Sequence, residues 1–182
     1  GSRPNVDTKS PDLQVNVHLV KNSCTVSLDM AGDPLDRRGY RLDRNKAPLR
    51  ENMAAAIIAF SGWAGETPLY DPMCGSGTIV IEAALKASNA APGLLRERFG
   101  FQNWLGHDPT LWRNMLTEAK ELRKQELAVR LRGSDRSPGS IEMSKQNAAR
   151  AGVGRLTSFT TADISTFEPS ASPAMIIFNP PY

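Results

Sequence analysis

From residue 68 onward, short apolar runs alternate with longer helical stretches, and this alternation constrains the fold more than any other feature. The apolar runs have the length and composition of buried strands, and the longer stretches have helical caps and spacing. The expected strands cover residues 68–71, 131–135, 156–161 and 174–178. The expected helices cover residues 78–90, 108–129 and 137–152. This order predicts an α/β fold with a mostly parallel sheet and helices on both faces.

The first 60 residues follow a different pattern. Residues 13–19 and 24–30 each alternate apolar and polar side chains, and residues 21–23 between them are typical of a turn. We therefore expect a β-hairpin, and because an isolated hairpin is marginal in water, we expect it to belong to a sheet whose other strands are not in this chain. A helix is predicted over residues 53–60, after the opening segment 47–51.

A glycine-containing loop follows the strand at residues 68–71 and leads directly into the next helix. It runs Asp71-Pro72-Met73-Cys74-Gly75-Ser76-Gly77-Thr78. Its two glycines allow the backbone to approach a ligand closely. No Lys-Ser or Lys-Thr pair follows Gly77, which excludes a P-loop, and the loop also differs from the three-glycine dinucleotide fingerprint. The loop therefore predicts a ligand site of another kind.

A second motif, Asn179-Pro180-Pro181-Tyr182, comes directly after the apolar strand at residues 174–178. Two successive prolines cannot continue a strand ladder and fix the backbone, so they hold Asn179 rigidly. A tyrosine at this place can stack on a base that has left its helix. Asp135 and Asp163 also follow strands, so both motifs and both acids should meet at the carboxyl edge of the sheet.

Basic residues are concentrated in one stretch although the net charge is only +3. Such a stretch suits a phosphate backbone, and a solvated loop would explain it equally well from charge alone. The candidate contacts to such a backbone are Arg37, Arg38, Arg41, Arg44, Lys46 and Arg50.

The remaining composition excludes several classes of protein. Cys24 and Cys74 lie far apart and outside any Cys-x-x-Cys pattern, so neither a disulfide framework nor a zinc site is expected. Neither His18 nor His107 has metal-ligand spacing, and we expect no metal. No run of about 18 apolar residues predicts a membrane span. We expect a cytoplasmic protein without membrane attachment.

Together, the glycine loop, Asp135 and Asn179 to Tyr182 resemble the class I Rossmann-like methyltransferases. The resemblance implies that S-adenosylmethionine binds with its methionine part in the loop and its amino group near Asp71. Asp135 would then accept hydrogen bonds from the ribose hydroxyls and Asp163 would lie near the adenine amino group. The oxygen of the Asn179 side chain and the carbonyl of Pro180 would accept from the target NH2. The implied cofactor site comprises Asp71, Pro72, Met73, Cys74, Gly75, Ser76, Gly77, Thr78, Asp135, Arg136, Asp163 and Asn179, and the implied catalytic residues are Asn179, Pro180, Pro181 and Tyr182.

A closer resemblance covers almost the whole chain. Residues 38–41, 47–51, 91–94 and 133–135, with the two motifs, look like the THUMP-linked RNA guanine-N2 methyltransferases, above all the bacterial members that act on large-subunit ribosomal RNA. It implies methylation of the exocyclic N2 of a guanine in 23S rRNA, with that RNA or a pre-ribosomal particle as partner. Residues 1–40 would be the end of a THUMP domain and a linker. Residues 41–182 would be the first four strands of a methyltransferase domain, truncated after the motif and therefore poorly active. Arg136 departs from the family, where an apolar residue is commoner.

Two other functions remain open from the sequence. Asn-Pro-Pro-Tyr alone does not distinguish guanine N2 from adenine N6, so a DNA adenine methyltransferase is one alternative. The THUMP-like lead-in and the basic stretch favour RNA. An inactive RNA-binding or assembly module is the other alternative, and it predicts no cofactor binding. The target nucleotide and the oligomeric state are not determined by the sequence.

Overall fold

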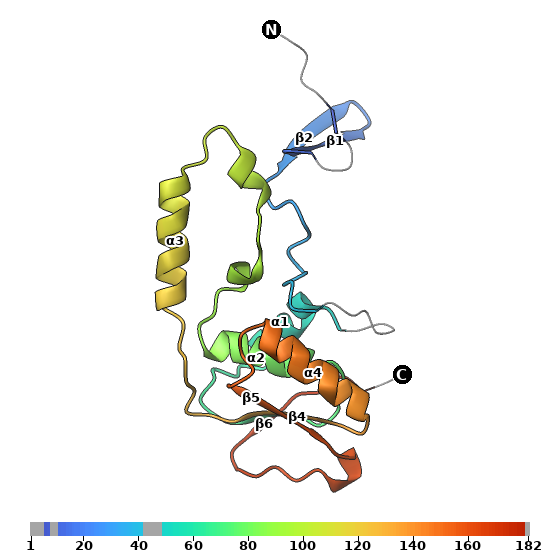
Figure 1. Cartoon of the computed structure of the whole chain (residues 1–182). Helices are drawn as coiled ribbons and strands as arrows, with labels where there is room; N and C mark the ends of the chain where they lie inside the picture. The colour runs from blue at the N-terminus through green and yellow to red at the C-terminus, as the bar shows by residue number, and fades with distance from the viewer. Residues whose placement is uncertain (1–5, 8–10, 42–48, 181–182) are drawn as a thin grey trace.

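A four-stranded parallel sheet forms the body of the protein (Figure 1). The computed structural model describes residues 6–7, 11–41 and 49–180. The spatial order of the strands is β5-β4-β3-β6, and neighbouring strands are all parallel. The strands are β3 (Leu69–Asp71), β4 (Leu131–Asp135), β5 (Thr157–Thr161) and β6 (Met175–Ile176). The predicted α/β fold with a parallel sheet is confirmed.

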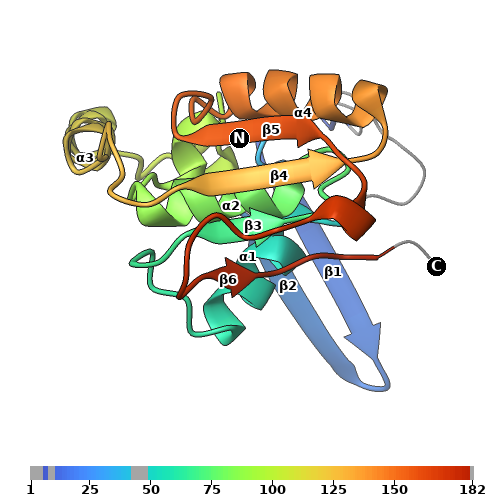
Figure 2. The same cartoon turned by 90° about the horizontal axis from the view of Figure 1, so that it is seen from below.

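The helices follow the predicted order but cover only one face of the sheet. Helices α2 and α4 pack on that face, and α1 packs against α2 (Figure 2). Among the described residues the other face carries the irregular segment 162–174, so the expectation of helices on both faces was wrong for this part of the chain. The α-helices are α1 (Glu51–Phe60), α2 (Thr78–Ala87), α3 (Pro109–Glu121) and α4 (Pro138–Arg150). The 3-10 helices are η1 (Pro92–Leu95), η2 (Gly100–Asn103) and η3 (Ile164–Thr166).

The core lies between the sheet and α2. Leu69 on β3 and Leu131 on β4 are almost completely buried, as are eight of the ten residues of α2. Because side chains alternate along a strand, the residue that follows Leu69 on β3 points to the other face of the sheet. On that face the hydroxyl of Tyr70 shares a hydrogen bond of 2.9 Å with Ser170 Oγ, and the Tyr70 ring packs edge-on against the ring of Phe167. The segment 162–174 thus covers Tyr70 without an α-helix.

Two helices end earlier than the sequence predicts. Helix α3 ends at Glu121 rather than near residue 129 because the following residues make tertiary contacts: the Lys124 N–H donates to the carbonyl of Ser88 at 2.8 Å. Helix α2 ends at Ala87, where Ser88 Oγ bonds back to Ala84 O at 2.6 Å and Asn89 adopts a left-handed φ of 54°. Local composition at both places is compatible with helix; a tertiary hydrogen bond accompanies the end of α3, and a local side-chain bond with a left-handed residue accompanies the end of α2.

The predicted hairpin is confirmed as β1 (Gln14–Val20) and β2 (Ser23–Asp29), paired antiparallel. Backbone hydrogen bonds hold the end of the hairpin to the body. In one of them the Phe101 N–H donates to the carbonyl of Met30 at 2.9 Å. Arg96 adds three donations from its guanidinium to the carbonyls of Ala31, Asp33 and Pro34. The segment after the hairpin is therefore tied to the connection between α2 and α3.

A glycine on β4 yields a test of this packing. A Cβ on Gly133 would lie 2.8 Å from Phe159 Cδ1 and 2.9 Å from Cys74 Cβ. We expect Gly133→Ala to lower the free energy of unfolding by about 1–3 kcal/mol through overpacking. Gly139→Ala, whose Cβ meets only Ser137 Oγ at 3.8 Å, is the matched control and should be neutral or stabilising. Urea denaturation measures both, and equal midpoints for the two variants would contradict the packing argument.

Candidate functional site

The chain reverses its direction of travel across the sheet at β3. From β3 it moves outward through β4 to β5, and it then returns to the opposite side of β3 as β6. Ligands of open α/β sheets bind at such a switch point, beyond the carboxyl ends of the strands. The carboxyl end of β3 is Asp71, and Asn179 follows β6 at the same edge, since the Ile177 N–H donates to Tyr70 O at 3.0 Å. Both sequence motifs therefore meet at this edge.

The loop after β3 is fastened to the end of β4 by its backbone. The N–H of Cys74 donates to Ser134 O at 2.9 Å, and that of Gly75 donates to Asp135 Oδ2 at 3.0 Å. A third bond comes from α4, where Asn147 Nδ2 donates to Ser76 O at 3.1 Å. The loop is held on two sides, so its shape is fixed before any ligand binds.

The two loop glycines have different roles. Gly77 caps α2 with a φ of 82°, and a Cβ there would lie 2.8 Å from Ser144 Cβ, so it is required for close packing of the loop on α4. Gly75 has a φ of 51°, and a Cβ built on it meets nothing within 4 Å. Gly77 is thus tightly packed, whereas the space beside Gly75 is open and leaves room for a ligand next to the loop.

Asp71 is a buried acid beneath the loop. Only 2% of its surface is exposed, and its Oδ1 accepts from Met73 N at 3.1 Å. Burial raises the pKa of Asp71 to about 7; the bond from Met73 opposes this shift, and the nearby Asp135 charge adds to it. A carboxyl group in this state favours a cationic partner, because a positive charge would restore its ordinary ionisation.

Asp135 presents a carboxylate whose position is fixed. Its Oδ1 accepts from Ser137 N at 2.9 Å, and its Oδ2 accepts from Gly75 N. Each oxygen retains a further lone pair, so the group can accept hydrogen bonds from two hydroxyls. Cys74 beside it is no nucleophile: burial, then the Asp71 and Asp135 charges, raise the pKa of its thiol far above the usual range.

Other predicted site residues are less enclosed. Asp163 is exposed and caps η3 by accepting from Ser165 N and Oγ, which lowers the pKa of Asp163. Arg136 is exposed directly after β4, and Asn179 and Pro180 are exposed after β6. Pro181 and Tyr182 lie outside the described residues.

The basic stretch divides into two groups. Arg38 pairs with Glu82 at 3.6 Å, and Arg41 Nη2 donates to Leu49 O and Thr78 Oγ1, so both guanidinium groups have protein partners. Arg37 is exposed, and Arg50 is 75% exposed with an ion pair to Asp36 at 3.7 Å. Arg44 and Lys46 lie outside the described residues.

Sequence reasoning missed two buried polar residues that support the site. Asn147 is 1% exposed and holds the loop through Ser76. Glu82 is 3% exposed on α2, four residues after Thr78. A signal existed for Glu82, since it is the one charged residue in the apolar run from Thr78 to Leu85. A lone acid on a helix this apolar needs a partner.

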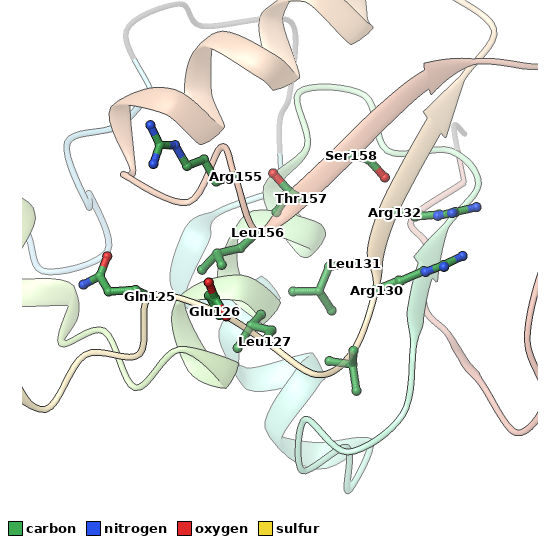
Figure 3. A pocket seen from close by; sticks show the side chains of 11 residues that line it. Gln125, Glu126, Leu127, Arg130, Leu131, Arg132, Arg155, Leu156, Thr157 and Ser158 are labelled. Atoms are coloured by element: carbon green, nitrogen blue, oxygen red, sulfur yellow. The ribbon is translucent and has the colours of Figure 1, made fainter.

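A pocket of about 580 Å³ lies at the opposite edge of the sheet, around the amino ends of β4 and β5 (Figure 3). Arg130 and Arg132 extend on one side of it and Arg155 on the other. Because ligands of parallel sheets bind at the carboxyl edge, this pocket is separate from the candidate site. Within residues 6–7, 11–41 and 49–180, no cluster of three potential metal ligands occurs, and no helix is long and apolar enough to cross a membrane.

Comparison with known families matches most of the chain. Residues 38–182 match the RMKL-like methyltransferase domain, and residues 1–29 match the THUMP domain. The ribosomal RNA large subunit methyltransferase K/L of Aeromonas hydrophila is 45% identical over 99% of the chain. The chain spans only 28% of the length of that relative.

Solved structures share the fold. SMU.472, crystallised as a complex with SAH, superposes with a TM-score of 0.87 and is 34% identical, covering 96% of this chain and 45% of that one. A protein from Listeria monocytogenes, described as a predicted N6-adenine-specific DNA methylase, has a TM-score of 0.85 and 38% identity over 93% of this chain and 44% of its own.

The raised pKa of Asp71 makes stability depend on pH. Because the folded-state pKa of about 7 exceeds the unfolded value of 3.8, the folded chain binds more protons between these values, and stability falls as pH rises through that window. This one group contributes a slope of at most about 1.4 kcal/mol per pH unit. Asp71→Asn should remove it while retaining an acceptor for Met73 N. Urea unfolding at pH 5 and pH 8 compares the wild type with Asp71→Asn. Glu82 contributes equally to both proteins, so the difference in slope reports on Asp71. Identical slopes of unfolding free energy against pH would contradict the assignment.

Proposed function

Because the chain belongs to the RMKL-like methyltransferase family, we propose that it binds S-adenosylmethionine and methylates an exocyclic amino group in ribosomal RNA. We further propose guanine N2 in 23S rRNA as the target, and a boundary between the THUMP part and the methyltransferase domain near residue 40. The observation that carries the proposal is the meeting of the glycine loop and Asn179 at the carboxyl edge of β3 and β6.

The cofactor fits the groups at this edge. S-adenosylmethionine has a cationic amino group, and Asp71 is a buried acid that such a cation would stabilise. Asp135 has lone pairs for the two ribose hydroxyls, and the open side of Gly75 allows close approach of the methionine part. When bound, the cofactor supplies a sulfonium-activated methyl group. The SAH complex of SMU.472 supports this choice of cofactor.

The protein's own contribution to catalysis is positioning. The oxygen of the Asn179 side chain and the carbonyl of Pro180 accept hydrogen bonds from the target NH2 and orient its nitrogen toward the methyl group. Pro180 fixes the backbone at this place, so the acceptors need no rearrangement during transfer. Tyr182 would stack on the flipped base. Asn179 and Pro180 would thereby hold the target nitrogen against the methyl group that the bound cofactor would supply.

RNA is the favoured substrate over DNA. The THUMP match at residues 1–29 and the exposed guanidinium of Arg37 support a partner with a phosphate backbone. The similarity to the ribosomal RNA large subunit methyltransferase K/L of Aeromonas hydrophila supports the same choice. Adenine N6 in DNA is the second candidate, because the similar protein from Listeria monocytogenes is described as a predicted N6-adenine-specific DNA methylase.

Methyl transfer to defined substrates tests the proposal. We expect the complete natural protein that contains this chain to transfer labelled methyl groups to 23S rRNA, with N2-methylguanine as the product. Asn179→Ala should lower kcat by about a hundredfold or more while RNA binding is retained, since it removes an acceptor that orients the nucleophile. Asn114→Ala, on the exposed side of α3, is the matched control. Label found only in DNA adenine would overturn the substrate, and absence of any cofactor binding would support an inactive module.

Cofactor affinity should depend on pH through Asp71. The cofactor's amino group lowers the pKa of Asp71 from about 7, so binding releases a proton and becomes tighter as pH rises from 5.5 to 7.5. The gain is at most about tenfold per pH unit. Asp71→Asn should bind more weakly and lose this dependence. Calorimetry with S-adenosylhomocysteine measures both, and a wild-type affinity that stays constant over this range would contradict the role of Asp71.

A further inference from the structure

The segment after the hairpin lies along one face of helix α2. Tyr40 is 1% exposed, and its hydroxyl donates to Glu82 Oε1 at 3.1 Å. Arg38 Nη2 lies 3.6 Å from Glu82 Oε2, with only 16% of the arginine side chain exposed. Residues 38–40 are therefore anchored on a buried carboxylate of α2, which compensates for the burial of that charge.

Arg41 extends the same contact to the beginning of α2. Thr78, the first residue of the helix, and Glu82 are four positions apart and so share one face. Arg41 Nη2 donates to Thr78 Oγ1 and also, at 3.0 Å, to the carbonyl of Leu49. A single Nη atom has two hydrogens, and these two acceptors use both. That nitrogen has no hydrogen left for a phosphate.

Thr78 connects this arginine to the glycine loop. Its hydroxyl lies 3.3 Å from Ser76 Oγ, within the loop, and the carbonyl of Ser76 in turn accepts from Asn147 of α4. Ser76 is thus held from α4 by its backbone carbonyl and from Thr78 of α2 by its side chain. The Thr78 hydroxyl can accept from Arg41 while it shares a hydrogen bond with Ser76, because it has one donor and two lone pairs.

We propose that Arg41 is a positioning residue for the cofactor loop, acting through the hydroxyl of Thr78, rather than a contact to RNA phosphate. The linker that leaves the THUMP part thereby helps to set the loop that holds the cofactor. This inference rests on the proposed function, since it assumes that residues 72–78 bind S-adenosylmethionine. It assigns the phosphate contacts of the described basic residues to the exposed Arg37 and Arg50 instead.

Two measurements on the complete natural protein separate these roles. Calorimetry with S-adenosylhomocysteine reports on the loop, and the salt dependence of RNA affinity reports on phosphate contacts. We expect Arg41→Ala and Thr78→Val to weaken S-adenosylhomocysteine binding by about tenfold or more, the loss of one charge-assisted hydrogen bond. Thr78→Ser keeps the hydroxyl and should bind within about twofold of wild type. The Arg41→Ala, Thr78→Val double variant should be no weaker than either single variant, because both remove the same interaction.

Arg37→Ala is the matched control for RNA. It should leave S-adenosylhomocysteine affinity unchanged and reduce the slope of log affinity against log salt by about one. Arg41→Ala should leave that slope unchanged. The inference is overturned if Arg41→Ala reduces the salt slope and leaves cofactor affinity intact, or if the Arg41 and Thr78 effects simply add. Failure of the wild-type protein to bind S-adenosylhomocysteine would instead contradict the proposed function itself.

Discussion

The arrangement of the site depends on the attachment of the glycine loop to the end of β4. Two backbone N–H groups, of Cys74 and Gly75, bond to Ser134 O and the Asp135 carboxylate. This attachment is possible only because Gly133 on β4 has no side chain, since a Cβ there would collide with Cys74. The loop shape, the orientation of Asp135 and the space beside Gly75 all follow from this close approach. The ligand site is consequently formed by the fold before any ligand is present.

Electrostatics at this edge follow from the same packing. The close contact that holds the loop also buries Asp71, and burial raises the pKa of its carboxyl group to about 7. Asp135 accepts hydrogen bonds from two backbone N–H groups. The two neighbouring acids thus differ in environment: Asp71 is buried and suits a cation, whereas Asp135 is half-buried and has lone pairs for neutral hydroxyls. S-adenosylmethionine carries a cationic amino group and neutral ribose hydroxyls, which match these two environments.

The second support of the site lies on α2. Glu82 is buried where residues 38–40 contact α2. Burial raises the pKa of its carboxyl group, while Arg38 and Tyr40 oppose the shift. Removing either partner would leave a buried charge uncompensated. At the other end of the linker, Arg96 bonds three carbonyls of residues 31–34. The segment 31–41 is therefore fixed at both ends, and Arg38 and Arg41 within it have protein partners.

The sequence by itself determined the order of strands and helices, the glycine loop and the proline-fixed Asn179, because periodicity, caps and proline geometry act over a few residues. It also determined that Asp71 and Asp135 end strands, and so share an edge once the sheet is parallel. Only the tertiary structure decided the early end of α3, the single helical face within the described residues, and the partners of Arg38, Arg41 and Asn147. The local sequence around a basic residue does not show whether its side chain faces solvent or a buried acid. Its role depends on contacts between segments far apart in the chain, which local patterns do not encode.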